Sequence, residues 1–256
     1  MLPRARKRNS ASRTKRRWAI AAGVVAVVAT AVLTYFVIGD SAAEGPRAPT
    51  PDEVSRLAIT RFRNYEARGR AVRITVPDPA GGLVVTGSVD YRAKIGYGVV
   101  KGKGRNDSGD GLLQWTATRL ALRPAADAPE RAPGTPPADG WYRRPLATAG
   151  GALDRALAIT LGLGSDRPDN AQLLPQNGAA WVGTDRIDGR PLDVLTGPES
   201  RERPGTADSV RYWLDANGVM YRAQARIAAE TEPAVIDFDT QEYTAVSPIP
   251  GLAPGG

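Results

Sequence analysis

Polar and apolar residues alternate along several successive segments of this chain, and this pattern sets the strongest limit on its fold. Apolar Val72, Ile74 and Val76 are separated by polar residues, and the same period recurs over 83–91 and 95–99. A period of two places neighbouring side chains on opposite faces of a strand. Further strands are predicted at 111–122, 140–144, 179–187, 190–197, 208–215, 219–228 and 234–245. Strands with one polar face are typical of an antiparallel sheet that covers a core with its other face.

The segment "RYWLDANGVMYRAQARI", from Arg211 to Ile227, predicts a hairpin. Asn217-Gly218 suits a two-residue type I′ turn, and this turn pairs Ala216 with Val219. In that register one face is apolar and holds the pairs Leu214–Tyr221, Tyr212–Ala223 and Val210–Ala225. The other face holds Asp215–Met220, Trp213–Arg222 and Arg211–Gln224. A three-residue loop would mix the two faces, and the apolar pattern therefore favours the two-residue turn.

Three helices are predicted beside the strands. The first begins at Thr50 as N-cap, with Pro51 in the first turn and Glu53 completing a capping box, and ends near Gly69. The second covers 150–164, where one face carries Leu153, Leu157 and Leu161. A short third helix is expected around 170–174. The strand and helix patterns together predict the fold class α+β, an antiparallel sheet packed on a few helices.

The chain contains no Cys and no His, and this composition narrows the possible chemistry. Disulfides, thiolate nucleophiles, Ser-His-Asp catalysis and the usual zinc sites all require one of these residues. Only mechanisms based on carboxylates and other side chains remain. We therefore expect a binding protein and not an enzyme, with no cofactor and no metal.

The net charge of +7 comes from the N-terminal tail. Residues 1–39 hold eight cations and no acid, which leaves 34 − 8 = 26 basic against 27 acidic residues elsewhere. The 21 residues from Trp18 to Ile38 carry no charge and are long enough to span a bilayer as a helix. Basic residues before the span favour a cytoplasmic N-terminus and an extracytoplasmic C-terminal domain. The tail is expected to touch anionic lipid and not nucleic acid.

These features predict a single-pass membrane protein. Its parts are a cytoplasmic tail (1–17), a transmembrane helix (18–38), a linker (39–50), an exported domain (51–246) and a disordered C-terminal tail (247–256). The Pro-rich stretch 123–140 is expected to be a flexible loop within the domain. A cleaved signal peptide is the alternative to the anchor, because Ser41-Ala42-Ala43 offers a cleavage site before Glu44.

Three short motifs suggest chemistry, and each has a simpler explanation. "GYGVVKGKG" (96–104) is rich in glycine, but it lacks the spacing and the Ser or Thr of a phosphate-binding loop. "NDSGDG" (106–111) lacks the alternating ligands of a calcium loop. Asp237 and Asp239 share one face of a strand and could form an acid–base or metal pair. The favoured explanations of the three motifs are a glycine-rich strand, a hairpin turn and a solvated strand face.

The order of the elements resembles that of the LolA/LprG-like group of exported domains, including its actinobacterial branch. The similar stretches are "GTDRIDGRPLDVL" (Gly183–Leu195) and the hairpin that follows it, within 51–244. In that group a curved antiparallel sheet wraps around helices and holds acyl chains. The resemblance therefore implies an α+β fold in which a curved antiparallel sheet (a half-barrel) packs on a few helices, preceded here by one transmembrane helix. It also implies a lipid or lipoconjugate ligand. The lipidated Cys of the group is absent here, and the span Trp18–Ile38 takes its place.

The expected site lies between the 150–164 helix and the apolar face of the sheet. The predicted ligand-binding residues are Val99, Trp115, Leu153, Leu157, Leu161, Tyr212 and Tyr221. The function expected from them is capture, hand-off or sensing of an apolar ligand at the cell envelope, with a possible envelope protein as partner. The same residues could instead fill an ordinary core, and then the domain would act as an interaction or regulatory module without bound lipid. A carboxylate enzyme built on Asp237 and Asp239 is the third hypothesis.

Overall fold

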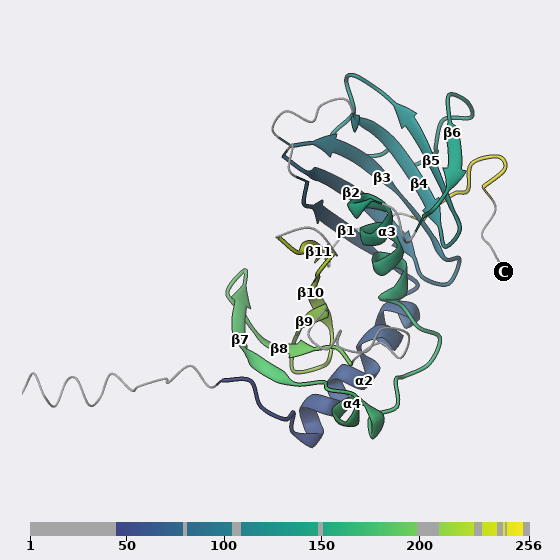
Figure 1. Ribbon diagram of the computed structural model, residues 1–256. Coiled ribbons are helices and arrows are strands. Elements are labelled where there is room, and N and C mark those ends of the chain that lie inside the picture. The colour runs from purple at the N-terminus through teal and green to yellow at the C-terminus, as the bar shows by residue number, and fades with distance from the viewer. Residues whose placement is uncertain are drawn as a thin grey trace, which may run out of the picture. The chain divides into compact units, whose positions relative to one another are not determined.

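The computed structural model describes residues 45–78, 81–103, 109–147, 151–198, 210–227, 232–239, 243 and 245–252 (Figure 1). Residues 45–256 form one compact unit. The tail 1–17 and the predicted span Trp18–Ile38 lie outside the described residues. Within the described part of the chain, no helix is both long enough and apolar enough to cross a membrane.

The domain is built on one open, curved sheet of eleven antiparallel strands with few helices (Figure 1). The strands are β1 (Gly69–Val76), β2 (Leu83–Asp90), β3 (Ile95–Gly102), β4 (Gly111–Thr116), β5 (Arg119–Pro124), β6 (Tyr142–Pro145), β7 (Trp181–Ile187), β8 (Arg190–Thr196), β9 (Val210–Leu214), β10 (Met220–Ala225) and β11 (Ala234–Asp239). Their order across the sheet is β6-β5-β4-β3-β2-β1-β11-β10-β9-β8-β7. Two meanders are thus joined where the first strand pairs with the last, and the α+β half-barrel predicted from the sequence is confirmed at this level.

The residues that the structure describes contain three helices, which are α2 (Pro51–Glu66), α3 (Ala152–Gly162) and α4 (Leu173–Gln176). Of these, α2 and α3 pack on the inner face of the sheet. The capping box at Thr50 is confirmed, since the Glu53 amide donates to the Thr50 hydroxyl and the Thr50 amide donates to the Glu53 carboxylate. α3 contacts strands of the β1–β5 meander and β11, while α2 contacts β9, β10 and α4 (Figure 1).

The predicted single strand 111–122 is wrong, because the chain turns back at Ala117-Thr118. The Thr116 hydroxyl accepts hydrogen bonds from the amides of Thr118 and Arg119 and stabilises this turn. The two halves become β4 and β5, which pair with each other. In the sequence, a polar residue followed by small residues is a weak turn signal. The turn between the two strands was therefore not predicted.

The hairpin register is confirmed for most pairs and wrong at the turn end. Tyr212 pairs with Ala223 as predicted, but Leu214 pairs with Met220 and not with Tyr221. The loop holds three residues, because the Asp215 amide donates to the Val219 carbonyl at 3.1 Å. A bulge between Met220 and Arg222 absorbs the extra residue and restores the apolar register. Tyr221 is therefore displaced to the outer face.

The main core lies between the inner face of the sheet and the helices. Its fully buried members include Ile74, Val85, Trp115, Leu157 and Leu214. Adjacent residues of one strand alternate between this core and the outer face, as the sequence pattern predicts. Close packing in this layer fixes α3 against the sheet.

A second apolar cluster covers the outer face of β3–β5. It consists of Tyr97, Val99, Leu112, Ala121, Trp141, Ile249 and Leu252. The C-terminal segment is held there by buried Gln114, which donates to the Ser247 carbonyl and accepts from the Ile249 amide, each at 2.8 Å. Residues 247–252 are therefore ordered against the sheet, which differs from the predicted disordered tail. Their apolar side chains cover an outer face that was expected to be wet.

The Pro-rich stretch 123–140 also packs on the outer face and is not a free loop. The Trp141 indole donates to the Pro137 carbonyl at 2.7 Å, and Arg123 donates to the Asp139 carbonyl at 3.1 Å. Partly buried Ala128 and Ala132 pack against the second cluster. Prolines reduce the entropy lost on ordering such an irregular segment.

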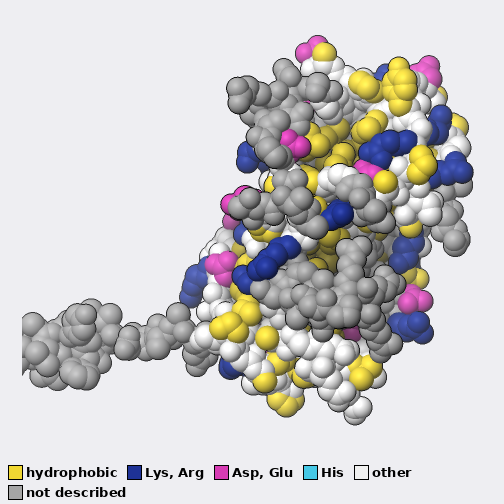
Figure 2. All heavy atoms as spheres, viewed as in Figure 1, with side chains coloured by type: hydrophobic (Ala, Val, Ile, Leu, Met, Phe, Trp, Pro, Cys, Tyr) yellow, Lys and Arg dark blue, Asp and Glu magenta, His cyan; other side chains and the backbone are white. Residues whose placement is uncertain are grey.

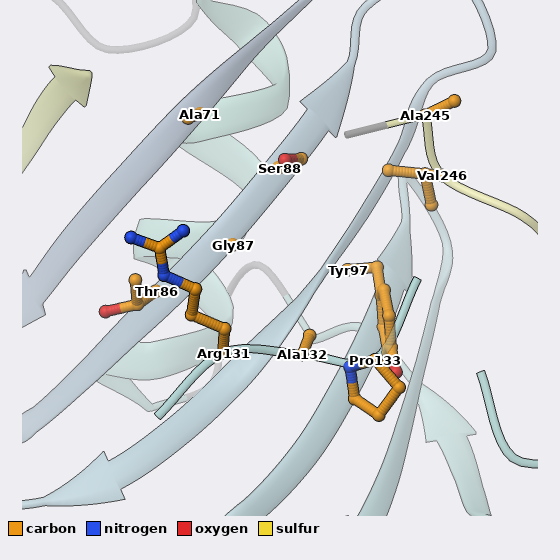
Figure 3. Close-up of a pocket in the computed structure, with 10 residues that line it drawn as sticks. All are labelled: Ala71, Thr86, Gly87, Ser88, Tyr97, Arg131, Ala132, Pro133, Ala245 and Val246. Atoms are coloured by element: carbon orange, nitrogen blue, oxygen red, sulfur yellow. The ribbon is translucent and has the colours of Figure 1, made fainter. Parts of the chain in front are cut away.

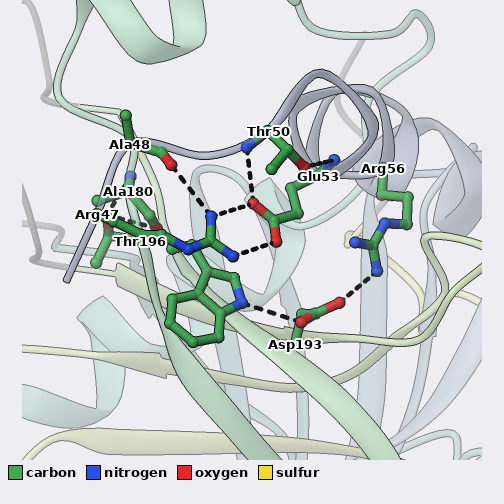
Figure 4. Close-up of polar contacts among 9 residues, drawn as sticks. Arg47, Ala48, Thr50, Glu53, Arg56, Ala180, Asp193 and Thr196 are labelled. Carbon is green, nitrogen blue, oxygen red and sulfur yellow. Dashed lines mark hydrogen bonds and ion pairs between the residues drawn. The ribbon is translucent and has the colours of Figure 1, made fainter. Parts of the chain in front are cut away.

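The end of the predicted linker belongs to the domain (Figure 4). Arg47 pairs by its main chain with Trp181 at the edge strand β7, and its guanidinium lies 4.1 Å above the Trp181 ring. The same guanidinium donates two hydrogen bonds of 2.8 Å to the Glu53 carboxylate. Asp193 accepts from the Trp181 indole and from Arg56, and these contacts join the linker end, α2 and β8.

Candidate functional site

The structure brings together five of the seven predicted ligand-binding residues and separates the other two. Trp115, Leu157 and Leu161 are buried in the main core, and Leu153 and Tyr212 pack against it. Val99 belongs to the second cluster, on the outer face. Tyr221 also faces outward, where it packs near Trp213 and lies under the Arg190 guanidinium at 4.7 Å. One cavity lined by all seven residues does not exist.

The space expected behind Leu157 is filled by the protein itself. Leu157 and Trp115 are each 0% exposed, and the Trp115 indole donates to the Leu157 carbonyl at 3.2 Å. Gly96 makes room for the indole, since a Cβ at this position would lie 2.2 Å from the Trp115 ring. The middle of α3 is therefore in direct contact with the sheet, and the glycine-rich motif at 96–104 serves strand packing where the structure describes it.

A pocket opens at the N-terminal end of α3, and we name it the α3 pocket. Its volume is about 370 Å³, near the lower limit for small-molecule sites. The apolar part of its lining comes from Val76, Pro77, Leu83, Ala152 and Leu153. Of the seven predicted residues, Leu153 is the one that lines this pocket.

The polar side of the α3 pocket is formed by an ion pair and by Asp78. Arg144 of β6 donates two hydrogen bonds of 2.6 Å to the carboxylate of Asp154 on α3. The Asp154 carboxylate also accepts from the Ala147 amide at 2.8 Å. Burial alone would raise the pKa of Asp154, but these hydrogen bonds outweigh it and lower the pKa. The pair stays charged at neutral pH and ties the edge strand to the helix.

A second pocket adjoins the first around the free edge of β6, and we name it the edge pocket. It has a volume of about 440 Å³ and is lined by Thr118, Arg119, Arg143, Arg144 and Pro145. Arg119 and Arg143 also donate to the carbonyls of Gly251 and Pro250 in the C-terminal segment. Arg144 pairs with Asp154, while Arg119 and Arg143 bring further positive charge to the lining of the edge pocket.

The two pockets share Arg144, and together they form the candidate site. Apolar groups line one half of the site and guanidinium groups the other. Figure 2 shows hydrophobic side chains on this face of the domain, with basic and acidic side chains among them. Such an arrangement suits a ligand with an apolar part and an anionic part.

The carboxylate pair considered for catalysis is placed away from this site. Asp237 lies on the outer face of β11 and forms an ion pair of 2.6 Å with Arg222. The Asp239 side chain is not among the described ones. Within the described residues, no three acidic side chains are grouped as a metal site would require.

The sequence reasoning missed the arginines of the candidate site. Their signal was present in "YRRP" (142–145), an edge strand whose four residues are all exposed. A short strand with two adjacent cations places one on each face, so Arg144 points to α3 while Arg143 reaches the C-terminal segment.

Comparison with known proteins gives no assignment. No family model matches the chain, and no curated protein is significantly similar to it. The function must therefore be argued from the site.

Proposed function

We propose that this protein is a membrane-anchored, extracytoplasmic binding protein for an amphiphilic ligand such as a lipid or lipoconjugate. The apolar part of the ligand occupies the α3 pocket, and its anionic group contacts the arginines of the edge pocket. The observation that carries this proposal is the sharing of Arg144 between an apolar and a basic pocket. The order of elements that resembles LolA/LprG-like domains, and the uncharged span Trp18–Ile38, support the same reading.

The packing of α3 limits the size of the ligand. Because Leu157 and Trp115 fill the centre of the domain, a ligand in the α3 pocket stops near Leu153 unless α3 moves away from the sheet. A shallow site of this kind suits sensing or hand-off better than storage of a long acyl chain.

The ligand test compares two tryptophan substitutions on the same helix. Leu153 and Ile159 both pack against the main core while partly exposed, but only Leu153 is among the residues that line the α3 pocket. In a fragment beginning at Gly45, Leu153→Trp should weaken binding of a fluorescent fatty acid about tenfold or more. Ile159→Trp should leave the affinity unchanged. Equal affinities in the two variants would refute the site.

The head-group test uses the charge of the edge pocket. The fatty acid should bind more tightly than its methyl ester, because only the acid is anionic. Arg143→Gln should reduce this preference and leave binding of the ester unchanged. Sequencing the N-terminus of the mature protein tests the anchor, since a chain that begins at Glu44 would show cleavage.

The alternative function is an envelope interaction or regulatory module, which the packed core and the exposed edge strand favour. Tyr142 on β6 is the large apolar side chain with the highest exposure among the described residues, at 73%. A domain of this kind would bind neither the fatty acid nor its ester in the preceding tests. It would instead lose its partner when Tyr142 is replaced by Ala.

A further inference from the structure

The C-terminal segment 245–252 lies on the outer face of β3–β5 in the way that a bound peptide would. The side chain of Gln114, which is 0% exposed, holds two main-chain groups of this segment, each at 2.8 Å. Arg143 and Arg119 donate to two further main-chain groups, at 2.7 and 3.4 Å. All four hydrogen bonds thus join a side chain of the sheet to the main chain of the segment. Such contacts hold a peptide without reading its polar side chains.

A tight turn gives the segment its shape. The Leu252 amide donates to the Ile249 carbonyl at 3.1 Å, with Pro250 and Gly251 between them. Gly251 has a φ of +77°, and proline followed by a residue of positive φ is the pattern of a type II turn. The turn buries both of its apolar ends, since Ile249 is 3% and Leu252 is 0% exposed. The face below therefore suits an apolar-Pro-Gly-apolar sequence.

The surface below the turn is a groove lined by apolar side chains, and we name it the outer groove. Its lining consists of Tyr97, Val99, Leu112, Ala121 and Trp141. The two aromatic rings stand at an angle of 58°, with their centroids 6.5 Å apart. Grooves lined by aromatic side chains are a common binding surface for proline-rich peptides.

A pocket of about 190 Å³ lies next to the outer groove, on the outer face of β1–β3 (Figure 3). Tyr97 and Val246 belong to both the groove and the pocket, so the two are continuous. The first residue of the segment, Ala245, also lines the pocket and is exposed. An engineered cavity of about 150 Å³ holds benzene, so this pocket has room for one aromatic ring. The C-terminal segment therefore leaves part of the available surface unused.

We propose that the outer groove binds a peptide of a partner protein, and that the C-terminal segment competes with this peptide. The partner peptide carries an apolar-Pro-Gly-apolar turn and, four residues before the turn, an aromatic side chain that fills the pocket. The tethered segment binds with an effective concentration on the order of 1 mM, so the partner peptide gains its advantage from the pocket. This proposal goes beyond the ligand proposed for the α3 pocket and does not depend on it.

The first test compares synthetic peptides on the full wild-type chain in lipid nanodiscs. The parent peptide is AVSPIPGL, the sequence of residues 245–252, with a fluorophore at its C-terminus. The change Ala245→Phe in this peptide should strengthen binding about tenfold or more, because the ring is buried in the pocket. The change Ser247→Phe is the matched control and should bring no such gain, since Ser247 is exposed and does not line the pocket. Fluorescence polarisation measures binding, and empty nanodiscs correct for partition into lipid.

The second test weakens the competing segment within the chain. Gly251→Ala places an L side chain at positive φ and should lower the occupancy of the groove by the segment about five- to thirtyfold. The parent peptide should then bind more tightly by the same factor, because its apparent affinity follows the fraction of open grooves. Gly134→Ala is the matched control, since nothing lies within 4 Å of a Cβ there, and it should leave the affinity unchanged.

Thermal unfolding checks that both protein variants are folded, and the peptide comparison on the wild-type chain needs no variant. An Ala245→Phe peptide that binds no more tightly than the Ser247→Phe peptide would overturn the proposal. Equal affinities of the parent peptide for the wild-type and Gly251→Ala chains would also overturn it. So would the absence of saturable binding to the Gly251→Ala chain up to about 1 mM peptide.

Discussion

Replacing Gly96 with alanine should destabilise the domain strongly, although the change adds one methyl group. The new Cβ would lie 2.2 Å from the ring of Trp115, which is 0% exposed and has no free space to enter. Overpacking a filled core costs about 1–3 kcal/mol. A displaced ring would also lose the hydrogen bond from its indole to the Leu157 carbonyl, a further ~0.5–1.5 kcal/mol.

The expected loss is about 2–4 kcal/mol of unfolding free energy, or a fall of about 5–15 °C in melting temperature for a domain of this size. Gly162→Ala is the matched control, because nothing lies within 4 Å of a Cβ at the end of α3. Alanine there should be neutral or stabilise by up to about 0.5–1 kcal/mol. Thermal unfolding followed by tryptophan fluorescence measures both. A Gly96→Ala variant as stable as the wild type would show that α3 stands away from the sheet.

Two further predictions concern the Arg47–Glu53 ion pair and the hairpin. The hydrogen bonds from Arg47 lower the pKa of Glu53 to about 2. Their contribution to stability is therefore complete above the pKa of the unfolded chain, near 4.5, and is lost as the pH falls toward 2. Because Arg47 is partly exposed, Glu53→Gln should lower the free energy of unfolding by about 1–2 kcal/mol at pH 7 and by little at pH 2. Chemical denaturation at both pH values measures the difference. In the hairpin, Leu214→Asp places a charge in the main core and should unfold the domain, whereas Tyr221→Asp on the outer face should cost about 1 kcal/mol. Equal losses of melting temperature in these two variants would contradict the bulge.

The period-two pattern predicted the strands well because it reports the alternation of side chains directly. When the side chains on both faces of a strand are apolar, however, this pattern does not show which face is turned to the helices. Val99 was predicted to line the inner face, but the structure places it, with Tyr97, on the outer face, while Val100 enters the main core. The information that decides between the faces lies in the remote C-terminal segment, which covers Val99 through Ile249 and Leu252.

The hairpin shows a different limit. Its apolar pattern determined the pairing of Tyr212 with Ala223, and this pairing survived a loop that is one residue longer than predicted. The bulge near Tyr221 compensated for the longer loop, since keeping the apolar face buried outweighs the disrupted pairing of one residue. The residues of the turn alone did not distinguish the two-residue loop from the three-residue loop, because Asn217-Gly218 fits both.

The candidate site was predictable only in part, because it joins segments that pattern reasoning treats separately. Leu153 was expected from its helical stripe, but Arg144 comes from an edge strand and meets Asp154 only after folding. The pocket on the outer face of β1–β3 depends on contacts with 131–133 and 245–246. Of these, 131–133 was predicted to be part of a flexible loop, and 245 was predicted to end the last strand.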